Sequence, residues 1–274
     1  MGISIWDQDR KTLSPLAFDK SGDISLNITP LWTIEGDRIV YLSFREASYI
    51  LNWKSSTGTG IEEPLISNML ASIGIAVPSS WSEDGKTMIL TQGHIGDGRD
   101  DSDIIALSME GDRTWEPLLN EEYSEFQPRI SDDGQWMAYT SNESGRDEVY
   151  VRPFPDVNKW RKPVSVNGGD NPLWSPDGRK LFYLNDGAVI AVTLETEPEF
   201  RLGKPVTLFH GNYVGSNPSF YRDFHVWDIH PDGKRFLMLK PLESEDQVYE
   251  TASPRKINIV LNWFEELKKL APVQ

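Results

Sequence analysis

The stretch Asn171–Leu184, NPLWSPDGRKLFYL, decides the fold of this chain. Pro176 presets φ for an early turn position, and the side chain of Asp177 can bond to nearby backbone amides. Gly178 tolerates the positive φ that a tight hairpin requires. Large apolar residues stand on both sides of this turn, in the spacing typical of strands. The stretch therefore predicts a strand, a tight turn and a second strand.

The same frame occurs five times along the chain. In each copy an aromatic residue or isoleucine stands four positions before a glycine, and two apolar residues follow at plus three and plus five. These glycines are Gly36, Gly85, Gly134, Gly178 and Gly233, separated by 49, 49, 44 and 55 residues. A strand-rich repeat with a period of roughly 40–50 residues is the sequence signature of a β-propeller. We therefore predict an all-β propeller of five to six four-stranded blades, followed by a short C-terminal helix.

The repeats run almost from end to end, which predicts a single domain over residues 1–274. Two strand-like pieces within residues 1–20 precede the first repeat, and residues 257–274 form a final strand and an amphipathic helix. An open ring exposes sheet edges, so we expect the N-terminal strands to close the ring against Ile257–Trp263 or its blade. The helix is either a cap on the propeller or a docking element for a partner.

Composition limits the classes of function. The formal net charge is −15, with 42 acidic and 27 basic residues, so we expect no nucleic-acid partner and no anionic membrane surface. There is no apolar run of about 18 residues, which predicts no membrane insertion. The absence of cysteine excludes disulfides and thiolate chemistry. The N-terminal residues lack the pattern of a signal peptide, so the chain is either cytoplasmic or a fragment of a longer protein.

The sequence contains no recognisable catalytic motif. It has no G-x-S-x-G, no H-E-x-x-H and no P-loop. Ser144, in the segment NESGR, is placed by its neighbours in a hairpin turn rather than in a nucleophilic site.

Polar residues near the starts of the first strands are the candidate site. In a propeller these strands line the central channel, so residues distant in sequence converge there. The candidates are Glu125, Gln127, Asp170, Asn171, Asp223 and His225. Such oxygens with one imidazole could hold a divalent cation, either calcium or, through His225, zinc or manganese. His225 is also the candidate catalytic residue, as metal ligand or general base. The alternative is that these groups bond to loop backbone and channel water.

Two further segments carry weaker signals. Asp97, Asp100, Asp101 and Asp103 form either a solvated hairpin or a surface calcium site. The long segment Gly211–Phe224 is rich in glycine, asparagine and aromatic residues, and we expect it to overhang one channel mouth. It could bind a sugar or a peptide, or serve as an ordered cover.

Together these stretches resemble a known family. LWSPDGRKLFYL resembles the WD-like repeat of TolB-type propellers. YTSNESGRDEVYVRPFPD (Tyr139–Asp156) and the ending INIVLNWFEELKK are similar to the C-terminal sensor propeller of some bacterial serine/threonine kinases, here in a truncated form. The resemblance implies an extracytoplasmic domain of a larger protein that binds ligands or proteins.

Two functional classes follow. The first is a non-catalytic binding module for a small molecule, sugar or peptide, or for an envelope protein. The second is a metal-dependent hydrolase of lactones, esters or phosphotriesters, with the metal in the central channel polarising the substrate and activating water. Its support is a likeness at the level of fold alone.

Overall fold

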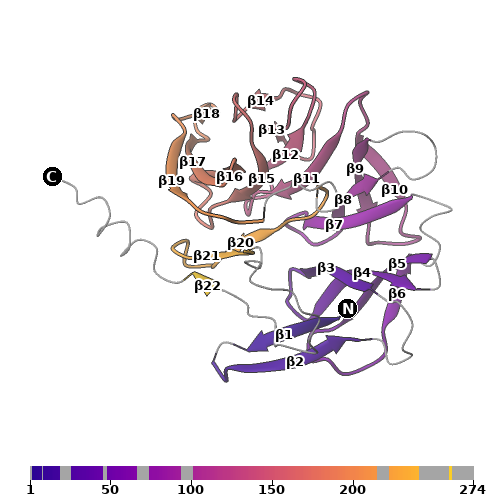
Figure 1. The fold of residues 1–274 in the computed structure, drawn as a ribbon. Helices are drawn as coiled ribbons and strands as arrows, with labels where there is room; N and C mark the ends of the chain where they lie inside the picture. The colour runs from indigo at the N-terminus through magenta and orange to yellow at the C-terminus, as the bar shows by residue number, and fades with distance from the viewer. Residues whose placement is uncertain are drawn as a thin grey trace, which may run out of the picture.

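The computed structural model describes residues 2–7, 9–18, 26–45, 48–66, 74–93, 101–214, 222–240 and 259–260. Every helix or strand element in these residues is a β-strand (Figure 1). Five antiparallel sheets follow one another along the chain, and an N-terminal hairpin forms a sixth, two-stranded sheet. The all-β propeller prediction is confirmed, and the predicted C-terminal helix lies outside the described residues. Nowhere in the described ranges does a helix have the length and apolar character needed to cross a bilayer.

Each blade is an antiparallel meander that begins at the centre of the molecule. The first three are β3 (Leu26–Trp32), β4 (Arg38–Arg45), β5 (Ser48–Ser55) and β6 (Glu63–Ile66); β7 (Ile75–Trp81), β8 (Thr87–Gly93), β9 (Ser102–Ser108) and β10 (Trp115–Leu119); and β11 (Glu125–Ile130), β12 (Trp136–Ser141), β13 (Glu148–Pro153) and β14 (Lys162–Pro163). The others are β15 (Asp170–Trp174), β16 (Lys180–Asn185), β17 (Ala188–Glu195), β18 (Arg201–Leu202) and β19 (Val206–His210); and β20 (Trp227–Ile229), β21 (Phe236–Met238) and β22 (Ile259–Val260).

The first strands of successive blades are neighbours in space. Strand β3 contacts β7, β7 contacts β11, β11 contacts β15, and β15 contacts β20. Figure 1 shows the sheets following one another around the centre that these strands line. This arrangement brings residues from all five repeats together although they are far apart in the sequence.

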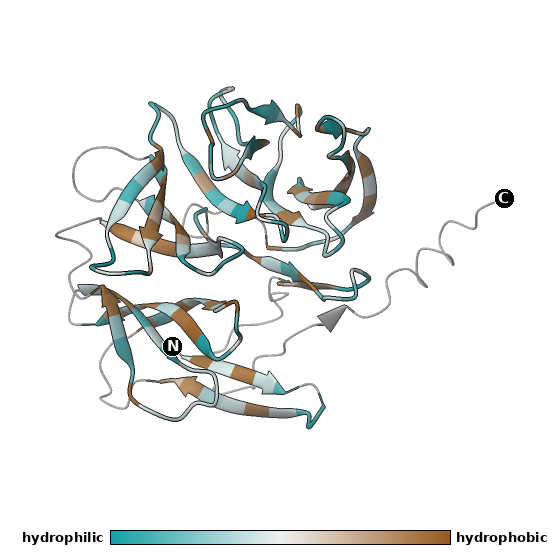
Figure 2. Cartoon of the chain, turned by 180° about the vertical axis from the view of Figure 1, so that it is seen from behind, coloured by the Kyte–Doolittle hydropathy of each residue, from teal (hydrophilic) through white to brown (hydrophobic). Residues whose placement is uncertain are grey.

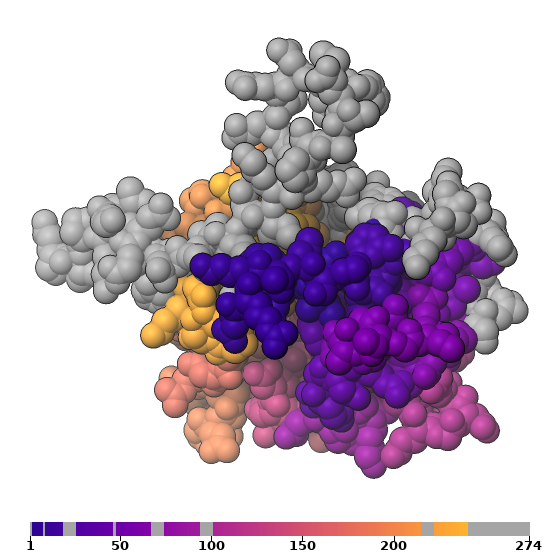
Figure 3. Space-filling view, turned by 90° about the horizontal axis from the view of Figure 1, so that it is seen from below, coloured from indigo at the N-terminus to yellow at the C-terminus, as the bar shows by residue number. Residues whose placement is uncertain are grey.

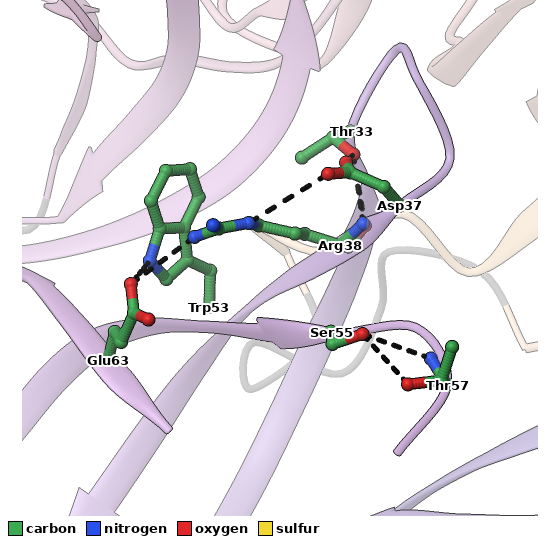
Figure 4. A network of polar contacts seen from close by, with 7 residues as sticks. All are labelled: Thr33, Asp37, Arg38, Trp53, Ser55, Thr57 and Glu63. Atoms are coloured by element: carbon green, nitrogen blue, oxygen red, sulfur yellow. Dashed lines mark hydrogen bonds and ion pairs between the residues drawn. The ribbon is translucent and has the colours of Figure 1, made fainter. Parts of the chain in front are cut away.

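The five repeated turns have the same geometry, as the shared frame predicts. The turn glycines have φ between 67° and 70°, and each donates its backbone N–H to the carbonyl three residues before it. In four copies a Ser or Thr hydroxyl donates to an aspartate in the turn, as Ser175 Oγ does to Asp177 Oδ1 at 2.6 Å. Figure 4 shows the first copy, in which Thr33 donates to Asp37. Local chemistry alone therefore accounts for the repeated hairpin.

The hydrophobic core lies between adjacent sheets rather than in one central mass. One cluster joins the first and second blades through residues such as Val40 and Met88, and another joins the third and fourth through Val151 and Leu181. Figure 2 shows apolar residues concentrated on the strands and polar residues in the turns and loops. Because both faces of a blade are covered, strands such as β16 are apolar in a continuous run instead of alternating.

The N-terminal hairpin packs on the first blade. Strands β1 (Ile3–Asp7) and β2 (Thr12–Ala17) pair with each other, and their buried residues contact Ile39 and Tyr41 of β4. Figure 3 shows the N-terminal residues, in indigo, lying against the residues of the first blade. Among the described strands β22 pairs with β21, and neither β1 nor β2 pairs with it. Among the described residues, the expected pairing of these N-terminal strands with Ile257–Trp263 is therefore not found. Residues 261–274 lie outside the described ranges.

Candidate functional site

Gln127, one of the candidate channel residues, joins three blades. Its Oε1 accepts hydrogen bonds from Thr140 Oγ1 at 2.9 Å and from the backbone N–H of Asn171 at 2.8 Å. Its Nε2 donates to the carbonyls of Arg222 and Phe224 at 2.7 and 3.2 Å. The residue is fully buried and has φ of 56°, in the left-handed region. These contacts engage both ends of the amide in structural hydrogen bonds.

Asn171 has the same role in the following blade. It has φ of 53°, and its Oδ1 accepts a hydrogen bond from the backbone of Val226 at 3.3 Å. Its backbone carbonyl accepts the indole N–H of Trp227 at 2.9 Å. Thr29 stands at the matching frame position of the first blade and also has positive φ, at 53°. Two of the candidate site residues thus bond to backbone, which is the alternative that their sequence pattern left open.

His225 lies beside Arg129, which sequence reasoning did not single out. Arg129 Nε donates to His225 Nδ1 at 3.3 Å, and Arg129 Nη1 donates to the carbonyl of Ser79 at 3.3 Å. Burial and the Arg129 charge hold the pKa of His225 well below its usual range, against the opposing effect of the Pro128 carbonyl. A neutral imidazole that accepts at Nδ1 carries its proton on Nε2. Neither ring nitrogen then offers a free lone pair, so this state favours neither base nor ligand.

Glu125 is a buried carboxyl at the start of β11. Its side chain is 1% exposed, and neither oxygen has a hydrogen-bond partner among the described residues. Burial is the largest cause that raises the pKa of Glu125 to about 8, and the charges of Glu121 and Asp103 add to it. The Glu121 backbone and the Arg152 guanidinium oppose the shift. Glu125 is therefore mainly protonated at neutral pH, which makes it a poor cation ligand.

The remaining candidates also have protein partners. Asp170 Oδ1 accepts from Asn171 Nδ2 at 3.1 Å, and Asp223 Oδ1 accepts from Ser102 Oγ at 2.9 Å. Across the described ranges no three His, Asp or Glu side chains are grouped so that they could hold a metal ion. The assignment of a metal centre to these residues stays a prediction.

The other sequence signals are placed as follows. Ser144 is in an exposed turn and donates to the Arg146 carbonyl at 3.1 Å, as its neighbours predict. Asp103 lies in β9 and is 1% exposed, while Asp97 and Asp100 lie outside the described residues. In the segment Gly211–Phe224 only residues 211–214 and 222–224 are described, and these contact the blades.

A funnel opens at the opposite ends of the first strands, where the repeated turns begin. Its volume is about 560 Å³, within the range of roughly 300–1,000 Å³ that is typical of ligand sites. Every blade contributes to its wall at two levels. The inner ring, one residue before the repeat Trp or Ile, consists of Leu31, Ser80, Arg129, Leu173 and Asp228. The rim, two residues after it, consists of Ile34, Glu83, Asp132, Pro176 and Pro231.

The funnel combines apolar walls with separated charges. Trp81 and Trp174 line it between the two rings, and both indoles donate to carbonyls in the preceding blade, at 2.8 and 2.9 Å. Burial lowers the pKa of Arg129, and the charge of Asp228 opposes that effect. Burial, together with Asp133, raises the pKa of Asp132. The site therefore has one cation, Arg129, in its inner ring. The carboxylates are those of Asp228 in the same ring and of Glu83 and Asp132 on the rim.

Alignment of the five frames could have found this site. When the five repeats are aligned, the inner-ring position is Leu, Ser, Arg, Leu and Asp in order. Arg129 and Asp228 are thus two residues of opposite charge at a position that is otherwise small or apolar. The candidates chosen from the sequence stand near the starts of the first strands, whereas the accessible funnel is at their ends.

Comparisons with known proteins agree with this architecture. No protein-family profile matches the sequence, and no curated protein is similar to it in sequence. Among solved structures, TolB from Acinetobacter baumannii has a TM-score of 0.58 at 20% identity, over 86% of this chain and 55% of that one. A putative TolB from Agrobacterium tumefaciens has a TM-score of 0.56 at 16% identity, over 73% and 70%. A chain of the nidogen/laminin complex has a TM-score of 0.59 at 10% identity, over 84% and 76%. The chain has the fold of a TolB-like β-propeller.

Proposed function

We propose that this propeller is a non-catalytic binding module that receives a peptide or protein segment in the funnel. The observation that carries the proposal is the two-level ring of residues, to which all five blades contribute. Such a concave site, with apolar walls and a few placed charges, is the usual form of a binding pocket.

The surface around the mouth supports a polypeptide ligand. Trp32 and Ile34, next to the funnel and on its rim, are 48% and 55% exposed. Exposed large apolar residues beside a concave site are typical of surfaces that bind other proteins. The structural similarity to a chain taken from the nidogen/laminin complex is consistent with this class of function.

The hydrolase alternative has no comparable support. His225 Nδ1 accepts from Arg129, and the amides of Gln127 and Asn171 bond to backbone. No specific contact among the described residues favours a hydrolytic centre, so this alternative stays a prediction.

The test is binding of the purified protein to a random pentapeptide array that carries every sequence in two forms, with a free carboxylate and as an amide. We expect a subset of peptides to bind, and expect Ile34→Ala to weaken their binding up to about tenfold, because it removes apolar surface from the wall. Val166→Ala is the matched control, since Val166 is 65% exposed and does not line the funnel. Equal effects of the two substitutions, or no bound peptide, would contradict the proposal.

A further inference from the structure

Arg129 is the feature of the funnel that the fold does not explain. A guanidinium in the inner ring is removed from most of its hydration, which costs free energy unless an anion compensates for it. The partners of Arg129 among the described residues are His225 and the Ser79 carbonyl rather than a carboxylate, although Asp228 is near enough to affect its pKa. The leucines at the same position in the first and fourth blades show that the fold itself needs no charge there.

The hydrogen bonds of Arg129 leave its outer end available. Nε donates to His225 and one N–H of Nη1 donates to the Ser79 carbonyl. Of the five N–H groups of a guanidinium, three remain, on Nη1 and Nη2. Two parallel N–H groups at this end match the two oxygens of a carboxylate. His225 and Ser79 thus hold the guanidinium while its fork is left for an anion.

The rest of the funnel limits what that anion can be. Glu83 and Asp132 on the rim and Asp228 in the inner ring surround the approach to Arg129. These acidic residues would repel a small dianion such as phosphate but would attract a positively charged group attached to the carboxylate. The apolar walls formed by Leu31, Trp81 and the other side chains between the rings suit an apolar side chain next to it.

From this geometry we infer that the funnel binds the C-terminus of a partner polypeptide, with its α-carboxylate on Arg129, its last side chain against the apolar wall, and a preceding Lys or Arg near Glu83, Asp132 and Asp228. A chain end enters as a single strand, whereas an internal acidic residue would require two strands to leave through the same mouth. This inference rests on the proposed binding of peptides in the funnel and names the ligand class.

The same pentapeptide array tests it, because each sequence is present both as a free acid and as an amide. For the wild-type protein we expect binding to the free acids with basic residues two or three positions before the end, and a loss of at least about tenfold on amidation. Arg129→Met should remove the preference for the free acid, and Arg129→Lys should retain it at lower affinity, because lysine keeps the charge but not the fork. Arg10→Met is the matched control for loss of charge, since that side chain is 82% exposed on the N-terminal hairpin.

Asp228→Asn and Glu83→Gln should each weaken the preference for basic residues without abolishing that for the free acid. Equal binding of acids and amides, with both weakened in Ile34→Ala, would overturn the role of Arg129 but leave peptide binding in the funnel intact. Binding of amidated peptides through an internal acidic residue would overturn the chain-end assignment. If no peptide binds, both proposals fail. The wild-type comparison needs no variant, so it decides the question even if Arg129→Met does not fold.

Discussion

Replacement of Glu125 by glutamine should stabilise the propeller at alkaline pH. The carboxyl is 1% exposed, and its pKa is raised from 4.5 to about 8, chiefly by burial. Between these two pH values the unfolded chain releases the proton while the folded chain keeps it. The folded state therefore binds more protons, and the free energy of unfolding falls as the pH rises from about 4.5 to about 8.

The size of the effect follows from the same shift. A pKa that rises from 4.5 to about 8 changes by about 3.5 units, and one unit corresponds to about 1.36 kcal/mol. Glu125 therefore disfavours the folded state by up to about 5 kcal/mol at pH 8 and by almost nothing below pH 4.5. Glutamine has nearly the same shape and does not ionise, so Glu125→Gln should lack this pH dependence.

Urea denaturation of both proteins at unit steps from pH 5 to pH 8 measures the difference. We expect the stability of Glu125→Gln relative to wild type to increase by about 1 kcal/mol per pH unit over this range. Glu116→Gln is the matched control for removal of a carboxyl, because Glu116 is exposed on β10. A difference between Glu125→Gln and wild type that is constant from pH 5 to pH 8 would refute the reasoning.

Three further predictions concern the packing of the blades. Gly134→Ala should destabilise the protein by about 2–3 kcal/mol, because the φ of 67° is unfavourable for alanine and the added Cβ would lie 2.9 Å from Glu83 Cβ. Gly178→Ala has the same φ but no atom within 4 Å of the added Cβ, so it should cost about 1–2 kcal/mol. Urea denaturation measures both, and equal costs would contradict the contact between turns. Gln127→Leu should lower stability by about 3–5 kcal/mol, because it removes four side-chain hydrogen bonds, two of them buried; a thermal melt unchanged from wild type would disprove its joining role. Deletion of residues 1–18 should cause aggregation or a large fall in melting temperature, because it exposes the apolar surface of β4, and a deletion variant as stable as the full chain would contradict the packing of the hairpin.

The sequence by itself determined the repeating hairpins and hence the fold class. Each turn is specified by residues close together in the chain, such as Ser175, Asp177 and Gly178, whose bonds all form within a few positions. Repetition of that local pattern at intervals of 44 to 55 residues left a propeller as the simplest closed arrangement. Local interactions are visible in a sequence because their partners are neighbours in it.

The tertiary structure decided which residues of the first strands lie around the funnel. Gln127 and Asn171 were predicted from their residue types as cation ligands, whereas their hydrogen bonds to blades 44 to 97 residues away became visible only in the tertiary structure. Arg129 was not recognised, because one arginine in a strand has no signature until five strands place their inner-ring residues around one funnel. Contacts between blades depend on how neighbouring sheets face each other, and that distance and direction are set by the closed packing of the whole molecule rather than by any single repeat.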